Sequence, residues 1–216
     1  MHDKTIIITA GGIGKRMGGD IPKQFLLFES QPILMKTIAC FHTFDNQAQI
    51  LVTLPEAWKS YWEELCEQYQ FSIPHTLLSG GKERYHSIQG ALSLATGKYI
   101  AVHDGVRPNV SQETIQRCFD SAKTTGSGIP VLEVSESLRE LLPNGESRAV
   151  VRSNFRSVQT PQVFEKSILV KAYQLPFHDG ITDDASLVEE AGYTVSLVEG
   201  NVENVKITTK VDLIYK

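Results

Sequence analysis

The chain alternates between two kinds of hydrophobic pattern. Short apolar runs predict buried strands at residues 5–9, 49–54, 75–78, 99–103 and 128–133. Apolar residues at helical spacing predict helices at residues 31–44, 56–69, 83–95 and 112–124. Alternating strands and helices indicate an α/β domain whose sheet is mostly parallel. Ligands of such sheets bind beyond the carboxyl ends of the strands, so polar residues that follow a strand are candidates for a site.

Two of these helices carry further signals. Ser30 is the candidate N-cap of the helix at 31–44, and Pro32 falls in its first turn. In the helix at 56–69, Trp58, Trp62 and Leu65 share one face, which predicts core packing.

The alternation stops between residues 136 and 159. Pro143-Asn144-Gly145 is a turn signal between segments 137–142 and 148–158, which predicts an extended hairpin. A lone hairpin is marginally stable in water, and a second subunit is the simplest partner for it. We therefore expect residues 1–216 to form a single domain in which 136–159 is a β-arm that forms a homodimer. Beyond this arm, the pattern predicts helices at 165–174 and 183–191, a strand at 194–199, and a closing segment at 205–216.

Charge and cysteine content narrow the class of protein. A net charge of -4 and a pI near 5.9 give no general attraction to nucleic acid or to an anionic membrane. A polyanionic ligand must therefore be held by a local cluster of cations. The three cysteines, Cys40, Cys66 and Cys118, are scattered and form neither a disulfide framework nor a metal box. With no signal peptide and no apolar run near membrane-spanning length, we expect the cytoplasm.

Such a cluster of cations follows the first predicted strand. Gly11, Gly12 and Gly14 allow the backbone to come close to a phosphate, and Lys15, Arg16 and Lys23 add positive charge. The segment lacks the Gly-Lys-Ser/Thr ending of a P-loop and the third glycine of a dinucleotide fingerprint. It predicts a triphosphate-binding loop, with a structural glycine turn as the alternative.

The same segment resembles a known signature. Ala10-Gly-Gly-x-Gly-Lys-Arg-Met17, followed by Pro22-Lys-Gln-Phe25, is similar to the loop of the sugar-nucleotide and alditol-phosphate nucleotidyltransferases. The Pro-Lys-Gln variant resembles the 2-C-methyl-D-erythritol 4-phosphate cytidylyltransferase family, to which ribitol-5-phosphate cytidylyltransferases are close relatives. Later matches follow in family order: Gly80-Gly-x-x-Arg84-x-x-Ser87, His103-Asp-Gly-Val-Arg-Pro108, Gln159-Thr-Pro-Gln162, Thr182-Asp-Asp-Ala-Ser186, and Gly200 with Asn204-Val-Lys-Ile-Thr208.

The resemblance implies a fold and a reaction. The fold is the nucleotide-diphospho-sugar transferase (Rossmann-like) three-layer fold with an inserted β-arm. The reaction is transfer of CMP from CTP to 2-C-methyl-D-erythritol 4-phosphate, which releases diphosphate and forms 4-CDP-2-C-methyl-D-erythritol for non-mevalonate isoprenoid synthesis. The partners expected are thus CTP and a polyol phosphate, with Mg²⁺ as cofactor, and with neither nucleic acid nor a membrane.

The resemblance also assigns roles to residues. Catalytic roles fall on Lys15, Arg16, Lys23 and Lys206. Nucleotide binding falls on Ala10, Gly11, Gly12, Gly14, Gly80, Gly81 and Ser87. Acceptor binding falls on Asp104, Arg107, Ser137, Arg152, Thr160 and Thr182. Asp104 is also the metal ligand, because Mg²⁺ takes few carboxylates together with substrate phosphates. The fork-shaped guanidinium of Arg107 suits a phosphate monoester.

Several alternatives stay open at these positions. Asp104 could instead cap a turn or pair with Arg107, and the glycines at 80 and 81 could serve helix capping. Lys206, in the strand-like run 205–207, could be an edge-strand lysine. Ser135 competes with Ser137 for the place of the family's threonine, and Val151 replaces an aspartate that often precedes the arginine matched by Arg152. His103 is left out of the site.

Three other functions compete with this one. A ribitol-5-phosphate cytidylyltransferase would use the same arginine and hydroxyl groups. A glycosyltransferase of the same fold needs a metal motif such as Asp-x-Asp, where this chain has Asp104-Gly-Val. An NAD(P)-binding Rossmann protein needs the fingerprint that is missing here.

Overall fold

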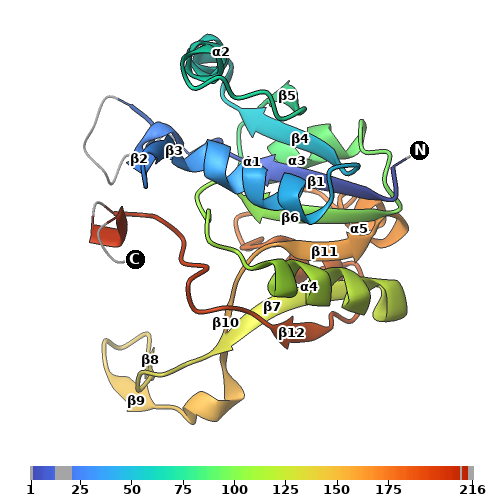
Figure 1. Ribbon diagram of the computed structural model, residues 1–216. Helices are drawn as coiled ribbons and strands as arrows, with labels where there is room; N and C mark the ends of the chain where they lie inside the picture. Colours follow the sequence, from blue (N-terminus) through green and yellow to red (C-terminus); the bar gives the residue numbers. More distant parts are fainter. Residues whose placement is uncertain (1, 13–20, 210, 214–216) are drawn as a thin grey trace.

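The computed structural model describes residues 2–12, 21–209 and 211–213 (Figure 1). An eight-stranded sheet runs in the order β10-β7-β11-β6-β1-β4-β5, with β12 beside β7. The strands of this sheet are β1 (Lys4–Thr9), β4 (Gln49–Leu54), β5 (Thr76–Ser79), β6 (Tyr99–Asp104), β7 (Ser127–Glu133), β10 (Arg156–Val158), β11 (Gln162–Glu165) and β12 (Leu197–Glu199). The pairs β5–β4, β4–β1, β1–β6 and β12–β7 are parallel, so the predicted mostly parallel sheet is confirmed.

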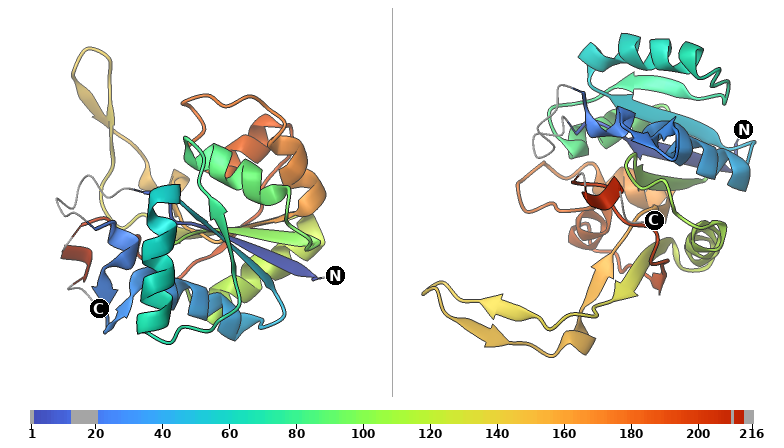
Figure 2. Two further views of the ribbon diagram at one scale, coloured as in Figure 1. Left: turned by 90° about the horizontal axis from the view of Figure 1, so that it is seen from above. Right: turned by 60° about the vertical axis from the view of Figure 1, so that its left-hand side comes forward.

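Helices cover both faces of this sheet (Figures 1 and 2). They are α1 (Ile33–Phe44), α2 (Lys59–Gln68), α3 (Arg84–Leu92), α4 (Gln112–Thr125), α5 (Lys166–Ala172) and α6 (Asp184–Glu190). Ile6 and Ile8 of β1 point to the face covered by α1, α2 and α4, while Ile7 points to the face covered by α3, α5 and α6. A strand with both faces buried reads as a continuous apolar run, which is why residues 5–9 show no polar alternation. The result is the three-layer fold that the sequence predicted.

The first helix begins later than its sequence pattern predicted. Gln31 and Pro32 form β3 (Gln31–Pro32), which pairs with β2 (Leu27–Phe28), and α1 starts at Ile33 with Pro32 as its N-cap. The predicted N-cap Ser30 is wrong, because Ser30 lies in the β2–β3 turn with φ 71°. The reason is local: a residue that precedes proline disfavours the helical conformation, which keeps Gln31 extended.

A second difference concerns β11. The sequence placed a helix at 165–174, and the structure shows a four-residue strand before a shorter helix. β11 runs antiparallel between β6 and β7, with Val163 opposite Ala101 and Gly128. This inserted strand places Thr160, just before it, beside the carboxyl end of β6.

The segment 136–159, which we call the arm, contains β8 (Arg139–Leu141) and β9 (Ser147–Ala149) in antiparallel pairing. Gly145 takes a left-handed φ of 84° in the turn between them. Both strands are exposed along their length, and Leu141 is 81% exposed. The β8–β9 hairpin of the arm projects away from the sheet in each view (Figures 1 and 2), while β10, near the end of the arm, pairs with β7.

Candidate active site

A cleft of about 380 Å³ opens where the loops after β1 and β5 meet the carboxyl end of β6. We call it the first cleft. Five of the residues predicted to bind the nucleotide line it, together with three others predicted as catalytic or metal-binding: Ala10, Gly11, Gly12, Gly81 and Ser87, with Lys23, Asp104 and Lys206. Gly80 lies beside the cleft and is not part of its lining.

The loop after β1 presents open backbone to this cleft. Ala10 donates its N–H to the carbonyl of Thr53 at 3.0 Å, and its own carbonyl accepts from the Gln24 side chain at 2.7 Å. A Cβ added at Gly11 or Gly12 would have no neighbour within 4 Å in the described part of the chain. A ligand can therefore approach the backbone closely, as a phosphate-binding loop requires. The predicted Gly14, Lys15 and Arg16 lie outside the described residues.

The loop after β5 is closed by a hydrogen bond between two predicted residues. Gly81 donates its N–H to Ser87 Oγ at 2.9 Å, and Ser87 donates its hydroxyl to the Glu83 carbonyl at 3.1 Å. A Cβ at Gly81 would lie 2.4 Å from the Cβ of His86, so this position requires glycine. The Ser87 hydroxyl thus stabilises the loop. The structural interpretation of this motif therefore stays open, together with base recognition.

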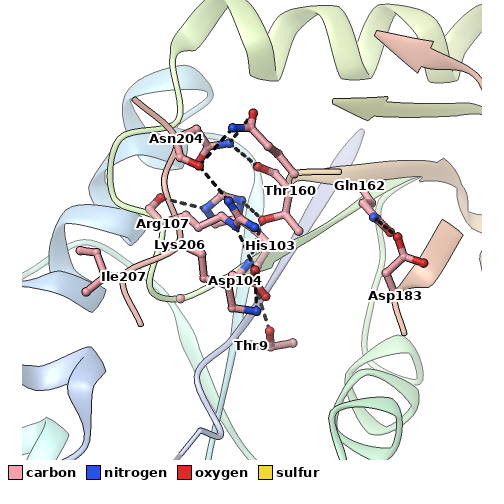
Figure 3. Close-up of polar contacts among 12 residues, drawn as sticks. Thr9, His103, Asp104, Arg107, Thr160, Gln162, Asp183, Asn204, Lys206 and Ile207 are labelled. Carbon is pink, nitrogen blue, oxygen red and sulfur yellow. Dashed lines mark hydrogen bonds and ion pairs between the residues drawn. The ribbon is translucent and has the colours of Figure 1, made fainter. Parts of the chain in front are cut away.

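Asp104, at the end of β6, is the buried carboxylate of the cleft. Its Oδ2 accepts from Arg107 Nε at 3.0 Å and forms an ion pair with Lys206 Nζ at 3.2 Å (Figure 3). Burial alone would raise the pKa of Asp104, but the charges of Lys206, Arg84 and Arg107 outweigh it and hold that pKa well below its usual range. Asp104 is therefore an anion at any working pH. Its pairing with Arg107, one of the open alternatives, is real and leaves the side chain in the cleft.

His103, which was not predicted to belong to the site, holds Arg107 and Thr160 in place. Its Nε2 lies 3.0 Å from the Arg107 carbonyl and its Nδ1 lies 3.0 Å from Thr160 Oγ1 (Figure 3). A carbonyl can only accept, so the network assigns the proton to Nε2, and Thr160 donates to Nδ1. Thr160 in turn accepts the Asp104 N–H at 3.1 Å. Burial lowers the pKa of His103 to about 4, so the ring is neutral near pH 7.

A second cleft, of about 330 Å³, adjoins the first and shares Asp104 with it. Four predicted acceptor residues line it: Asp104, Arg107, Thr160 and Thr182. Gln162 and Asp183, hydrogen-bonded to each other at 2.7 Å, also line it. Arg84, Asp104 and Lys206 line both clefts. These three residues therefore mark the place where ligands in the two clefts would meet.

The C-terminal segment brings Lys206 to the site without forming a strand. Residues 205–207 were expected to be strand-like, which is wrong: the segment is held by single contacts, with Ile207 donating to the Val106 carbonyl at 3.0 Å. Lys23 Nζ donates to the Ile207 carbonyl at 3.0 Å, and Arg107 Nη1 donates to the Asn204 carbonyl at 2.8 Å. Lys23 and Arg107, cations predicted from two distant parts of the sequence, thus both bind the segment that carries Lys206.

The two predicted arm residues are placed elsewhere. Ser137 and Arg152 are exposed, and neither is among the described residues that line the two clefts of their own chain. Arg152 donates to the carbonyl of Ser135. Both side chains therefore lie apart from the clefts of their own chain in this structure.

The structure adds residues that were not predicted for the site. Asn204 is fully buried and donates to the Thr160 carbonyl at 2.8 Å, and Arg84 forms an ion pair with Asp184. Both residues stand in motifs that match the family. Their polar character within those motifs is the only feature of the sequence that could have indicated a place in the site. Their roles depend on contacts with residues far away in sequence.

The clefts offer few protein ligands for a divalent cation. Among the described residues, no three His, Cys, Asp or Glu side chains group as a metal site. Asp104 Oδ2 is engaged by two cations, while Oδ1 has no partner in the described part of the chain. One free carboxylate oxygen beside a cationic cleft fits an ion held mainly by substrate phosphates, as Mg²⁺ usually is.

A three-layer fold, an open glycine loop after β1 and cations around a cleft at the carboxyl edge define a nucleotidyltransferase of the nucleotide-diphospho-sugar transferase fold. A family model described as 2-C-methyl-D-erythritol 4-phosphate cytidylyltransferase matches residues 4–216. The chain belongs to this family, and it is an enzyme of CTP-dependent cytidylyl transfer in isoprenoid biosynthesis.

Individual relatives agree with the family match. The 2-C-methyl-D-erythritol 4-phosphate cytidylyltransferase of Phocaeicola vulgatus is 48% identical over 212 residues, 98% of this chain and 96% of that protein. The one from Bacillus cereus is 37% identical over 213 residues, 97% of this chain and 94% of that protein. The crystal structure of the Thermus thermophilus enzyme of that name has a TM-score of 0.78 at 32% identity, covering 97% of this chain and 95% of that chain.

These findings also bear on the competing functions. The relatives carry the methylerythritol phosphate name, so ribitol 5-phosphate is not favoured as the acceptor, and neither is an NAD(P)-binding function. In the described part of the chain, the structure contains no helix with the length and apolar character needed to span a bilayer.

Proposed function

We propose that the chain catalyses direct in-line transfer between the two clefts, with CTP in the first and 2-C-methyl-D-erythritol 4-phosphate in the second. An oxygen of the acceptor phosphate attacks the α-phosphorus of CTP. The new P–O bond forms as the bond to the β-phosphate oxygen breaks, and that electron pair leaves with diphosphate. The acceptor phosphate is already ionised, so atoms and charge balance without a general base. The observation that carries this proposal is that Asp104 and Lys206 line both clefts.

On the nucleotide side, catalysis is positioning and charge stabilisation. The backbone of Ala10, Gly11, Gly12 and Gly14 would hold the triphosphate, and the loop of Gly80, Gly81 and Ser87 would hold the base. Lys15, Arg16, Lys23 and Lys206 would neutralise charge on the α-phosphate and on the leaving diphosphate. The contact of Lys23 with the Ile207 carbonyl holds its ammonium group at the segment that carries Lys206, and both lysines line the first cleft.

On the acceptor side, Arg107, Thr160 and Thr182 would bind the phosphate and the polyol. The Thr160 hydroxyl gives its proton to His103, so towards the acceptor it offers a lone pair, suited to a polyol hydroxyl. Ser137 and Arg152 would come from the arm of a second copy in a homodimer. This explains why two acceptor residues lie away from the clefts of their own chain.

We also propose Mg²⁺ as the cofactor and the cytoplasm as the location. Asp104 would hold the ion against the triphosphate, where the ion supplies neutralising charge. The cysteines Cys40, Cys66 and Cys118 are free, as is usual in a reducing compartment. Activity should vanish in excess EDTA and return with added Mg²⁺. Full turnover in the presence of EDTA would exclude a requirement for a divalent cation.

The decisive experiment is diphosphate release from CTP with 2-C-methyl-D-erythritol 4-phosphate and, in parallel, ribitol 5-phosphate. We expect turnover with the first acceptor, and a preference for the second would refute the assignment. Lys23→Ala should lower kcat by about 10²–10³-fold, because it removes a cation that stabilises the transition state. Lys123→Ala on the outer face of α4 is the matched control and should keep full activity.

A further inference from the structure

Of the three residues shared by the two clefts, Arg84 has no role in the mechanism so far. We infer that Arg84 is a catalytic residue whose guanidinium contacts the phosphate group under transfer, and that Asp184 and Tyr173 hold it in position. This inference rests on the proposed placement of CTP in the first cleft and of the acceptor in the second. A group that lines both clefts is within reach of the α-phosphate and of the attacking oxygen.

The guanidinium is held from behind by a buried carboxylate. Arg84 is the first residue of α3, and its Nη2 donates to Asp184 Oδ2 at 2.6 Å. Asp184 is fully buried, and its other oxygen, Oδ1, accepts from Tyr173 Oη at 2.6 Å. Both carboxylate oxygens are therefore used, and the orientation of Asp184 is fixed before substrate binds.

The opposite side of the guanidinium remains available to a ligand. The Arg84 side chain is 32% exposed, although its partner Asp184 is buried. An arginine has five N–H donors, and within the described part of the chain its hydrogen bond to Asp184 uses one nitrogen, Nη2. The remaining donors suit the adjacent oxygens of a phosphate better than the point charge of a lysine would.

The charge of Arg84 already acts on the reaction centre. It is one of the cations, with Lys206 and Arg107, that hold the pKa of Asp104 low. Burial, with the charge of Asp184, raises the pKa of Tyr173 well above its usual value, so its phenol stays protonated and keeps donating. A fixed cation at the point where charge develops needs no reorganisation during the reaction.

A purely structural role would look different in one respect. The Arg84–Asp184 pair links α3 to α6, and this link could be its whole purpose. In that case any neutral pair that preserves the hydrogen bond would also preserve activity. A catalytic role requires the positive charge itself.

The test is the double variant Arg84→Gln with Asp184→Asn. The single Arg84→Gln change would leave a buried carboxylate without its cation and could fail to fold, whereas the double change removes both charges and keeps an amide pair. We expect the double variant to melt near the wild-type temperature, to bind CTP with nearly unchanged Kd, and to lose about 10²–10³-fold in kcat. Tyr173→Phe, which keeps the ion pair, should lose less. Lys123→Gln with Asp120→Asn neutralises a remote surface pair and should match the wild type.

The outcomes separate the two ideas. A folded double variant with wild-type kcat, or one in which only KM for CTP or the acceptor rises, would overturn the catalytic role of Arg84. If the wild-type enzyme itself released no diphosphate with CTP and the acceptor, the proposed function would fail, whatever the variants did.

Discussion

His103 has no contact with solvent, yet its two ring nitrogens position two residues of the second cleft. One nitrogen binds the Arg107 carbonyl and the other accepts from Thr160, and Phe41 packs edge-on against the ring at 4.8 Å between centroids. Protonation would turn the acceptor nitrogen Nδ1 into a donor that competes with the Thr160 hydroxyl. The neutral ring is therefore part of the geometry of the site.

This residue should make folding stability depend on pH. Its pKa is about 4 in the folded chain and about 6.5 when unfolded, so below pH 6.5 the unfolded state binds the proton first. The stabilisation is complete above pH 6.5 and is lost as the pH falls towards 4, by about 2 kcal/mol between pH 7 and pH 5.

Urea denaturation at the two pH values measures this loss. His103→Gln keeps a donor and an acceptor without a titrating ring, so its unfolding free energy should change by about 2 kcal/mol less over the same interval. Equal pH dependence in the two proteins would mean that His103 titrates normally in the folded state.

At this scale the sequence predicted residues that line the clefts better than residues that hold them in place. Asp104 and Arg107 come from one motif, and Thr160 and Lys206 come from two others, yet all four line the second cleft. The sequence alone leaves His103 out of the site, because a lone histidine at a strand end is usually structural. Its function lies in contacts with Thr160, 57 residues away, and such pairing cannot be read from local sequence.

Close packing of elements depends on particular glycines. Gly128 in β7 faces α4, and a Cβ there would lie 2.1 Å from the Cys118 carbonyl oxygen. Gly90, on the exposed side of α3, would place a Cβ with no neighbour within 4 Å in the described part of the chain. A side chain larger than hydrogen is therefore excluded at Gly128 and tolerated at Gly90.

The same substitution should therefore have opposite effects. Gly128→Ala should destabilise the protein by about 1–3 kcal/mol or more, because backbone must move to relieve the contact. Gly90→Ala should stabilise it by about 0.5–1 kcal/mol, through the lower helix propensity of glycine. Chemical denaturation of both variants tests this, and a neutral Gly128→Ala would show that α4 can shift away from β7 at no cost.

The elements themselves were largely predictable where one periodicity dominates. The strand at 49–54 matches β4, and the helix at 112–124 matches α4 to within a residue. β11 was missed because four residues are too few to show a period, and its pairing with β6 and β7 is long-range. The β2–β3 hairpin was missed because its turn residues, Glu29 and Ser30, lack the usual glycine or asparagine.

For the molecule as a whole, the arm is the part that a single chain leaves unexplained. Three large apolar side chains of the arm are exposed: Leu141 (81%), Val151 (65%) and Phe155 (44%). Exposed apolar side chains that gather on one segment are typical of a surface that another protein covers. A homodimer would cover these side chains and bring Arg152 to the partner's second cleft. Light scattering should give twice the chain mass of 24.0 kDa, and a monomer would remove this role for Arg152.

Mixing two inactive variants tests whether the sites are shared. Lys23→Ala damages the first cleft of its own chain, and Arg152→Ala damages the second cleft of its partner. In a mixed dimer, the chain that carries Arg152→Ala has an intact Lys23 and receives Arg152 from the other chain, so one site is complete. Random reassociation should then restore about a quarter of wild-type activity. Lys23→Ala mixed with Lys206→Ala is the control, because each site of that dimer keeps one defect and no activity should return. If the first mixture stayed as inactive as the control, Arg152 would act within its own chain or not at all, and the arm would serve only to join the subunits.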